Sequence, residues 1–360
     1  MDRGGSAVNT LLSGIEQCRL GHQVTLAHGP SFESDMSLAE QTKVDIDVAI
    51  FKGLGGKIVI LPAMLRGMGA HDWQAYQQIK TLLLQNFDII HTHTSKAGAL
   101  GRLAAKQETI IHTPHGHIFH GYFGALKTNI FIAIERFLAH KTNALIALTK
   151  AERNDHLALS IGTPEQWHVV PSGVDILHIK KQVQDLNHET IWDAVSVGRL
   201  VPIKGMERLI TAWAKVCASK PDAKLALVGD GEERHALEAL TSELSITENI
   251  HFAGWADPLP YLASARCFTL LSHNEGMGRA VVEAFAAGLP CVVSDVCGLR
   301  ELVDDDVGCV VDAEQPEKVA SALLKKWGDK TRKAARERAQ FYSVEAMMRG
   351  LEKVYQDARS

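Results

Sequence analysis

The stretch SHNEGMGRAVVEAFAAGLPCVVSDVCGLREL, residues 272–302, decides the fold. It follows an apolar run at 267–272 that is typical of a buried strand. After a turn that contains two glycines, the pattern favours a helix from about Arg279 to Ala287, and a second apolar run at 290–294 predicts another strand. Strand, helix and strand joined by short loops form the unit from which parallel sheets are built.

The same alternation runs along the rest of the chain. In the second half it predicts further strands at 193–198, 224–229, 250–254 and 308–311. In the first half it predicts strands at 22–28, 44–50, 57–61, 87–93, 109–114, 143–149 and 167–172, and helices at 6–20, 71–86, 97–107, 122–140 and 151–160. We therefore predict an α/β protein with two Rossmann-like, doubly wound parallel-sheet domains that face each other across a cleft.

Chain length and composition agree with a two-domain globular protein. A chain of 360 residues is longer than a domain with one hydrophobic core usually is. Its residues are 46% hydrophobic and 22% charged, as in soluble globular proteins. We expect an N-terminal domain at 1–175, a C-terminal domain at 190–342 and a final helix at 343–360 that packs back toward the first domain. The segments 170–175 and 178–190 are expected to join the two domains.

Charge and cysteine usage exclude several classes of protein. The net charge of −4 does not support nucleic-acid binding. The six cysteines are scattered without a C-x-x-C pair, which indicates reduced thiols in a cytoplasmic protein. No apolar run approaches the roughly 18 residues of a membrane span, and no signal segment is apparent.

Two carboxylates surround the glycine turn of the opening stretch. Glu275 ends a strand, and Glu283 lies eight residues later on the following helix. The turn and the helix N-terminus favour a phosphate, whereas carboxylates accept hydrogen bonds from hydroxyl groups. Together they predict a ligand with an anionic centre and hydroxyls at both ends, as in a nucleotide sugar.

Positive charge to match that ligand comes from VGRLVPIKG, residues 197–205. Arg199 follows a predicted strand and Lys204 precedes a helix, so both cations should lie at the carboxyl end of the sheet. VGDGEER, residues 228–234, has the form of another strand–glycine–helix turn. Each turn alone is a common feature, but three with complementary chemistry in one domain favour a binding site.

These motifs resemble those of the retaining glycosyltransferases of family 4, which have the GT-B fold. The resemblance rests on the spacing of Glu275 and Glu283 and extends over nearly the whole chain. It includes GRLVPIKG (198–205), VGDGEE (228–233), AAGLPCVVSDVCG (286–298), SGVD (172–175), LPAMLRGM (61–68), DIIHTHTSKAGALGRLAA (88–105), TPHGHIF (113–119) and IERFLA (134–139). The first-half motifs resemble the branch that builds cell-surface polysaccharides on lipid carriers.

The resemblance implies a metal-independent hexosyltransferase without a cofactor. It would move a sugar from a nucleoside diphosphate, with UDP favoured, to a hydroxyl of a lipid-linked or growing glycan, with retention and without a protein nucleophile. The implied roles are diphosphate binding by Arg199 and Lys204, contact with the donor sugar by Glu275 and His115, ribose binding by Glu283, and backbone contacts from Gly276, Met277 and Gly278.

The N-terminal stretch MDRGGSAVNT, residues 1–10, resembles the acceptor-side glycine loop of the family, with Gly4 and Gly5 near the donor phosphates. Family members start with a strand before this loop, and no strand precedes it here. We therefore expect the first strand of the N-terminal sheet to be missing.

The histidines at 91–93 and 112–120 raise the alternative of a metal site, which we do not favour because almost no carboxylate or cysteine is interleaved. His93 and Lys96 are expected to lie near the cleft, and His112, His117 and His120 to be structural. In the helix at 122–140, the apolar stripe of Ile130, Phe131, Ile134, Phe137 and Leu138 is expected to face the core, with membrane binding as the alternative.

Other functions remain open at this point. A sugar-nucleotide epimerase shares the fold, a dinucleotide-dependent oxidoreductase would need a different glycine motif, and a non-catalytic nucleotide-sugar-binding protein would bind donor without turnover. The expected location is the cytoplasm, with peripheral contact at the inner face of a membrane where lipid-linked acceptors reside.

Overall fold

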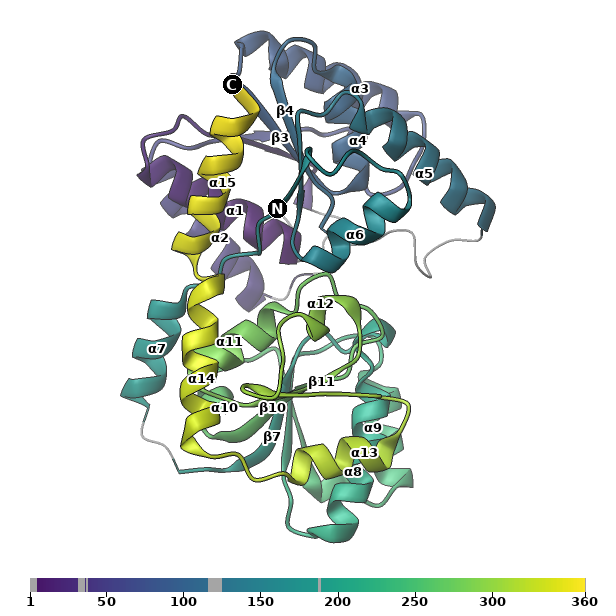
Figure 1. Cartoon of the computed structure of the whole chain (residues 1–360), viewed down its shortest axis with the longest axis vertical. Coiled ribbons are helices and arrows are strands. Elements are labelled where there is room, and N and C mark those ends of the chain that lie inside the picture. Colours follow the sequence, from purple (N-terminus) through teal and green to yellow (C-terminus); the bar gives the residue numbers. More distant parts are fainter. Residues whose placement is uncertain (1–4, 32–35, 37, 116–124, 187–188, 360) are drawn as a thin grey trace. The chain divides into compact units, whose positions relative to one another are not determined.

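The computed structural model describes residues 5–31, 36, 38–115, 125–186 and 189–359. Contacts divide the chain into two compact units, each of which is drawn in Figure 1. The N-terminal unit comprises Met1–Gly173 together with Glu345–Ser360, and the C-terminal unit comprises Val174–Val344. The chain therefore passes from the first unit to the second and returns.

The C-terminal unit contains one six-stranded parallel sheet in the order β12-β11-β10-β7-β8-β9. Its strands are β7 (Trp192–Val197), β8 (Leu225–Val228), β9 (Ile250–Gly254), β10 (Ala265–Leu270), β11 (Cys291–Ser294) and β12 (Gly308–Val311). The chain builds β7, β8 and β9 outward on one side and then crosses back to place β10 on the other side of β7. The point between β7 and β10, where the order reverses, is where open α/β sheets bind ligands.

Helices cover both faces of this sheet, because most of its strand residues are apolar and are shielded from water on both sides. In Figure 1, α8, α9 and α13 lie on one face and α7, α10, α11 and α14 on the other. Their bounds are α7 (Ile176–Asp185), α8 (Met206–Ser219), α9 (Arg234–Glu243), α10 (Leu259–Ala263), α11 (Arg279–Ala287), α12 (Cys297–Arg300), α13 (Pro316–Leu324) and α14 (Asp329–Ala339). Short 3₁₀ turns are η3 (Pro202–Lys204), η4 (Thr247–Asn249) and η5 (Gln340–Tyr342). The core between α8, α13 and the sheet includes fully buried Trp213, Leu225 and Leu227.

The N-terminal unit contains two separate parallel sheets. β1 (Thr25–His28) pairs with β2 (Lys57–Ile60), and the second sheet has the order β3-β4-β5-β6. Its strands are β3 (Ile89–His93), β4 (Thr109–Thr113), β5 (Ala144–Ala147) and β6 (Trp167–Val169). Among the described residues, β1 and β3 thus pair on one side only.

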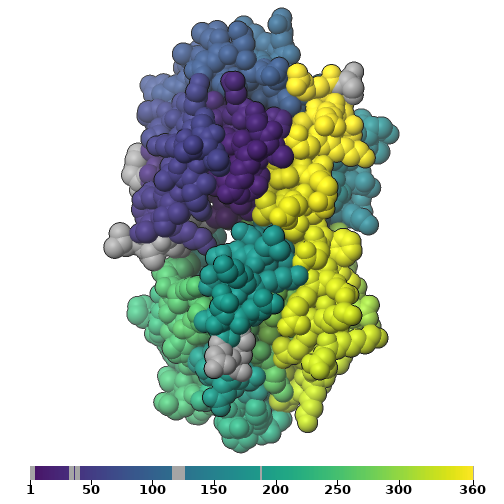
Figure 2. All heavy atoms as spheres, turned by 90° about the vertical axis from the view of Figure 1, so that its left-hand side faces the viewer, coloured from purple at the N-terminus to yellow at the C-terminus, as the bar shows by residue number. Residues whose placement is uncertain are grey.

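The final helix belongs to the N-terminal unit. The helices of this unit are α1 (Gly5–Arg19), α2 (Leu38–Gly53), α3 (His71–Leu82) with η2 (Leu83–Gln85), α4 (Ser95–Ala104), α5 (Ala125–Ala139), α6 (Lys150–Ala158) and α15 (Val344–Arg359). Figure 2 shows α15, in yellow, beside the purple N-terminal segment. The Tyr355 hydroxyl accepts a hydrogen bond of 2.8 Å from Gln17 Nε2 of α1.

Two expectations about local structure are wrong. Residues 44–50, predicted as a strand, lie inside α2. The alternation of valine and isoleucine with aspartate favoured a strand, but Val44, Val48 and Phe51 recur at helical spacing, and Phe51 is fully buried against Leu11 and Ile15. The segment 178–190, expected to join the domains, mostly forms α7, whose N-terminus is capped by the Asp175 carboxylate accepting from His178 N at 2.9 Å.

The apolar stripe of α5 also differs from the expectation. Leu138 is buried and Phe131 is partly buried, but Ile130, Ile134 and Phe137 are 52%, 41% and 55% exposed. The prediction of a core-facing stripe is therefore wrong for three of its five members. In the helices that the structure describes, none combines the length and apolarity needed to cross a bilayer.

Candidate active site

The loops that follow β7 and β10 are held against each other at the switch point of the C-terminal sheet. His273 N donates a hydrogen bond of 2.9 Å to Ile203 O across the two loops. Gly205 has a φ of 63°, and a Cβ there would lie 2.2 Å from Leu271 O. Only glycine allows both this conformation and this approach, so the sequence K-G at 204–205 positions the lysine.

A charged pair occupies this junction. Lys204 Nζ lies 2.6 Å from Glu275 Oε2, and Ser272 Oγ donates to the same oxygen at 3.1 Å. The lysine side chain is 21% exposed and the glutamate side chain 14%. Lys204 and Glu275, both expected as site residues, are thus brought together, while Ser272 was missed because a serine at a strand end carries no distinct signal.

The glycine turn after Glu275 is fixed by close backbone packing. Gly298 N donates to Glu275 O at 3.1 Å, and a Cβ on Gly298 would lie within 2.6 Å of the Gly276 carbonyl group. Met277 is buried, and Gly278 is the N-cap residue of α11 without a side-chain cap. The turn therefore delivers the positive end of the α11 dipole to the same edge of the sheet as Lys204.

Glu283 lies on α11, partly buried, one turn after Arg279. Desolvation lowers the pKa of Arg279, and the negative charge of Glu283 opposes that shift. Sequence reasoning missed Arg279, although its i, i+4 spacing from Glu283 is the signal that could have revealed the pair.

Arg199 lies in the loop after β7 that also carries Lys204, and the third glycine turn contacts this loop. Arg199 is exposed in the loop after β7. The next residue, Leu200, donates from its N–H to Asp230 O at 2.9 Å and accepts from Glu233 N at 3.1 Å, so the turn at 228–234 supports the loop that carries Arg199. Asp230 forms an ion pair of 3.0 Å with Arg234, so its carboxylate has a structural role within this turn.

The remaining expected site residues lie in the N-terminal unit. Gly4 lies outside the described residues, and Gly5 is the first residue of α1. His115 follows β4 with a φ of 60°, and its Nε2 lies 2.8 Å from His93 Nδ1 at the end of β3. The expected neighbours His93 and His115 are therefore in direct contact. Because both carry a single hydrogen-bonding proton when neutral, one donates and the other accepts.

A directional hydrogen-bond chain lies behind the two histidines. Gln17 donates to the Tyr355 hydroxyl, which in turn lies 2.8 Å from His91 Nδ1. His91 Nε2 lies 2.8 Å from Thr113 Oγ1, and the His91 and His93 ring centroids are 4.2 Å apart. With the tyrosine as donor, His91 carries its proton on Nε2 and donates it to the threonine.

Burial keeps these histidines neutral. Desolvation lowers the pKa of His115 to about 4 and, with the charge of His115 as a smaller cause, the pKa of His91 to about 3. The pKa values of His93 and His112 are lowered well below the ordinary range, again first by desolvation. The described residues include no group of three or more histidine, cysteine, aspartate or glutamate side chains arranged to hold a metal ion.

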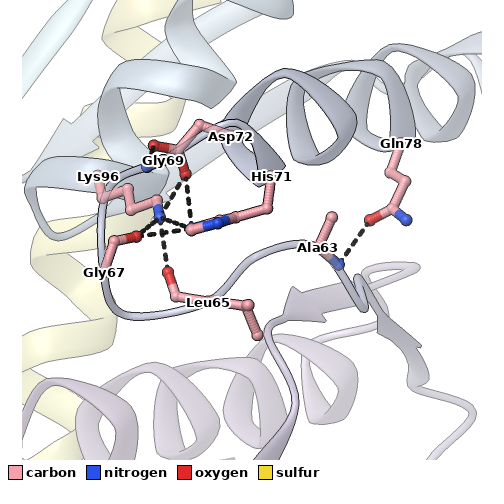
Figure 3. Close-up of polar contacts among 8 residues, drawn as sticks. All are labelled: Ala63, Leu65, Gly67, Gly69, His71, Asp72, Gln78 and Lys96. Carbon is pink, nitrogen blue, oxygen red and sulfur yellow. Dashed lines mark hydrogen bonds and ion pairs between the residues drawn. The ribbon is translucent and has the colours of Figure 1, made fainter.

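Lys96, expected near the cleft, anchors a loop. Figure 3 shows its ammonium group directed into the turn before α3. It donates to Leu65 O at 2.7 Å and also contacts Gly67 O and the Asp72 carboxylate. The Lys96 ammonium group is thus a charged donor to two backbone carbonyl oxygens and to a carboxylate, and these contacts hold the turn on α4.

Comparisons with known proteins cover the chain from residue 3 to residue 341. The family described as Glycosyltransferase Family 4 matches residues 3–176, and the family described as Glycosyl transferases group 1 matches residues 179–341. The chain is 29% identical over 268 residues to an Escherichia coli UDP-Gal:alpha-D-GlcNAc-diphosphoundecaprenol alpha-1,3-galactosyltransferase, a match that covers 70% of this chain and 69% of that protein. It is 27% identical over 248 residues to the putative glycosyltransferase EpsD of Bacillus subtilis, over 64% of this chain and 65% of that one.

Solved structures share the architecture. HepE of Anabaena, in complex with UDP and glucose, matches with a TM-score of 0.77 and 19% identity over 98% of this chain and 96% of its own. Sucrose-phosphate synthase from Thermosynechococcus elongatus matches with a TM-score of 0.79 and 19% identity over 98% of this chain and 93% of its own. Two parallel-sheet units, the two family matches and these neighbours lead to one conclusion: the chain belongs to glycosyltransferase family 4 and has the GT-B fold.

Proposed function

We propose that the protein is a retaining glycosyltransferase that moves a sugar from a nucleoside-diphosphate sugar to a hydroxyl of a lipid-linked or growing cell-surface glycan. The observation that carries this proposal is the Lys204–Glu275 pair at the switch point of the C-terminal sheet, beside the N-terminus of α11. A cation next to a helix N-terminus suits a diphosphate, and the adjacent carboxylate suits sugar hydroxyls.

In this proposal Lys204 exchanges part of its contact with Glu275 for the donor diphosphate. Arg199, exposed in the same loop, supplies a second positive charge. Both cations stabilise the negative charge that develops on the departing nucleoside diphosphate, and the backbone of Gly276, Met277 and Gly278 adds the helix N-terminus to that stabilisation. Such groups accelerate the transfer because they stabilise the leaving group most strongly in the transition state.

The two glutamates have separate proposed roles. Glu283, one turn into α11, binds the ribose hydroxyls, while Glu275, released from part of its pairing with Lys204, accepts hydrogen bonds from the transferred sugar. Attack from the face that the leaving group vacates gives retention without a protein nucleophile. The charge on Lys204, Arg199 and the α11 dipole makes a metal ion unnecessary for departure in this scheme.

For the N-terminal unit, we propose that His115 hydrogen-bonds a hydroxyl of the transferred sugar and that the backbone at Gly4 and Gly5 contributes near the donor phosphates. The contact with His93 holds the His115 ring, whose pKa of about 4 keeps it neutral near pH 7. A neutral ring is suited to share a proton with a hydroxyl.

The proposed donor nucleotide is UDP, and the proposed location is the cytoplasm. UDP is the nucleotide in the HepE complexes and in the name of the E. coli relative, whose printed acceptor is a diphosphoundecaprenol-linked sugar. These names support a nucleotide-sugar donor and a lipid-linked acceptor for this chain.

The first test is a thermal-shift panel of UDP-, GDP- and ADP-sugars with and without EDTA. Stabilisation by one nucleotide sugar, unchanged by EDTA, supports the donor site and the metal-independent scheme. A shift that requires a divalent cation contradicts metal independence, and no shift with any nucleotide sugar contradicts the donor proposal. Product analysis then separates the alternatives: an isomerised nucleotide sugar formed without acceptor indicates an epimerase, and binding without turnover indicates a non-catalytic protein.

The ribose assignment has its own test. Glu283→Gln should raise the KM for the donor about 10- to 100-fold, because a charged acceptor of ribose hydroxyl hydrogen bonds is lost. Glu243→Gln, an exposed glutamate at the end of α9, is the matched control and should leave KM unchanged. An unchanged KM in Glu283→Gln contradicts the ribose role. The anomeric configuration of the product, read by NMR, tests retention.

A further inference from the structure

Three arginines lie at the amino edge of the C-terminal sheet. Arg266 is the second residue of β10, and Arg332 and Arg336 lie about one turn apart on α14, which packs against α11 (Figure 1). Arg332 Nη2 donates a hydrogen bond of 3.1 Å to Arg266 O, so the two segments are in direct contact. Residues four apart on a helix are neighbours on its surface. We define Arg266, Arg332 and Arg336 as the arginine cluster.

A glycine makes room for the guanidinium group of Arg336. Gly288 is the C-cap residue of α11 with a φ of 81°, and an added Cβ there would lie 2.5 Å from Arg336 Cζ and 2.6 Å from its Nε and Nη2. A side chain at this position would displace the guanidinium group. A cation is also favourable at the C-terminal end of a helix, because the helix dipole is negative there. Gly288 and α11 thus hold Arg336 at the border of the two helices.

Arg266 is fixed by a backbone carbonyl and by a carboxylate that it shares. Its Nη2 donates to Leu323 O at 3.3 Å, and its Nε lies 3.4 Å from Asp193 Oδ1. The same carboxylate oxygen lies 2.7 Å from Lys220 Nζ. One carboxylate therefore serves two cations, and the positive charge of Arg266 is only partly compensated.

Positive charge is in excess around Arg332. Desolvation first, and then the charge of Arg336, lower the pKa of Arg332, whereas Asp329 opposes the shift. Glu337, the other acidic residue of α14, pairs with Lys333 at 3.8 Å. Like charges that lie close together in partly desolvated surroundings are unfavourable. A bound anion would remove that cost.

The cluster also has unused hydrogen-bond donors. With the residues that the structure describes, Arg332 hydrogen-bonds through Nη2 alone, and Arg336 forms no hydrogen bond or ion pair. A guanidinium group has five N–H donors in a planar fork, and this fork matches two oxygens of a phosphate group. The cluster therefore offers directed donors as well as charge.

We infer that the arginine cluster binds the phosphate group of a small soluble molecule, at a site separate from the proposed donor site. Arg332 and Arg336 donate to the phosphate oxygens, and Arg266 adds a third positive charge. The cluster lies at the amino end of β10, whereas Lys204 and Glu275 lie beyond its carboxyl end, and a strand of six residues spans roughly 20 Å. The inference goes beyond the proposed function, because binding here needs neither donor nor acceptor.

The composition of α14 favours a small soluble ligand over a bilayer or a nucleic acid. Apart from alanine, α14 contains no apolar residue, so it has no side chain to insert among acyl chains. A nucleic acid is bound by an extended stripe of cations, whereas the arginine cluster is compact and the chain carries a net charge of −4. A single phosphate group matches both the size and the charge of the cluster.

Thermal unfolding of the whole chain in inorganic phosphate tests the inference, with sodium chloride of equal ionic strength as the reference. Phosphate at about ten times its Kd should raise the Tm by about 3–5 °C, because a ligand that binds only the folded chain stabilises it. Isothermal titration with phosphate then gives the Kd. The absence of a specific rise in Tm with phosphate overturns the inference.

Matched variants assign the binding to the arginine cluster. Arg336→Gln removes a side chain without hydrogen bonds to the described residues, so the fold should be retained, and the Kd for phosphate should rise about tenfold or more. The double variant Arg332→Gln, Arg336→Gln should abolish the rise in Tm. Lys330→Gln with Lys333→Gln removes two exposed charges from the same helix and should change the Kd less than about threefold. Equal losses in the test and control variants overturn the assignment.

Two further readouts separate the possible sources of phosphate. The rise in Tm should persist in Lys204→Ala, and a rise that is lost there but kept in Arg336→Gln would assign the phosphate to the donor site and overturn the inference. Flotation with phosphatidylglycerol vesicles that depends on Arg336, without a rise in Tm in phosphate, would assign the cluster to lipid headgroups and also overturn it. A missing thermal shift with nucleotide sugars in all variants bears on the proposed function and not on the arginine cluster.

Discussion

Both units have polar side chains at the carboxyl ends of their strands, but these side chains differ in charge. In the C-terminal unit a lysine and a glutamate remain partly exposed and form a pair at the switch point of one continuous sheet. In the N-terminal unit, four histidines lie at and behind the ends of β3 and β4, and desolvation lowers the pKa of each. One unit offers permanent charge, and the other offers neutral hydrogen-bonding rings.

This difference follows from the surroundings of the groups. Lys204 and Glu275 sit on loops at the sheet edge, where each keeps some contact with water and with its opposite charge. His91 and His93 project from a strand into a space shared with His115 and Tyr355. Burial there removes most contact with water, and the described charged neighbours of these rings are cationic, so the neutral form is favoured.

The largest effect should come from removing the charged pair. Lys204→Ala should lower kcat/KM for transfer by about 10²- to 10³-fold, because a cation near the leaving group is lost. The matched control is Lys215→Ala, which also removes a lysine–glutamate pair, at 3.3 Å and well exposed, and should change kcat/KM less than about twofold. Similar losses of kcat/KM in both variants would show that Lys204 has no larger role in transfer than a surface lysine.

Acid should act on the N-terminal unit first. The folded-state pKa values of His115 and His91 are about 4 and about 3, below the value near 6.5 of an unfolded chain. Between these values the unfolded state binds more protons, so the free energy of unfolding falls as the pH drops from about 6.5 toward 4. The expected loss over this interval is about 3 kcal/mol for each of these two histidines taken alone.

Hydrogen exchange at pH 7 and pH 4.5, resolved by peptide, measures that loss in each unit. Peptides from β3 and β4 should lose protection at low pH more than peptides from β7 and β10. Equal acid sensitivity of the two sheets would show that the histidine rings are not the cause.

Sheet continuity gives the next prediction. β7 and β10 are paired on both sides, whereas β1 pairs with β2 alone among the described residues. We expect the amides of β1 to exchange about 10²-fold faster than those of β7 at neutral pH, because fewer neighbouring pairs must open together. Equal rates would mean that β1 is stabilised by contacts beyond its ladder, for example through Leu26 in the small core with Phe51.

The smallest effect should come from the hydroxyl behind the histidines. Tyr355→Phe removes hydrogen bonds of 2.8 Å to Gln17 and His91 and should lower the free energy of unfolding of the N-terminal unit by about 1 kcal/mol. Tyr261→Phe in the C-terminal unit removes an exposed contact of 3.3 Å to His251 and is the control. Chemical denaturation of both variants measures the two changes in the free energy of unfolding. Changes of the same size would show that the hydrogen-bond chain from Gln17 to Thr113 does not stabilise the N-terminal unit.

The C-terminal unit was more predictable from sequence than the N-terminal unit. Each of its predicted strands overlaps an observed one, because β7 to β12 are short, mostly apolar runs separated by distinct helices. In α2, alternating valine and aspartate gave a period of two over 44–50, and the burial of Phe51 overrode it. The local pattern predicts the wrong element there, because packing against the small core of Leu11, Ile15 and Phe51 determines which face of the segment is buried.

The candidate site was predictable in its parts and less so in its contacts. The glycine spacing placed Lys204 and Glu275 at strand ends, but their pairing depends on the approach of Gly205 to Leu271. Ser272 gave no separate signal, whereas the i, i+4 spacing of Arg279 from Glu283 was a signal that was missed. For α5, periodicity predicted one core-facing apolar stripe, but three of its five members are exposed. The rotation of the helix depends on the buried pair of Glu135 with Arg102, 33 residues earlier, which local periodicity does not reveal.

The return of α15 to the N-terminal unit has a consequence for synthesis on the ribosome. Residues 174–344, which form the C-terminal unit, are contiguous and are made before residues 345–359. The C-terminal sheet can therefore be completed while the N-terminal unit still lacks Tyr355, the partner of Gln17 and His91. Most of the N-terminal unit is therefore translated before residues 174–344, but the unit reaches its final form only after α15 has been made.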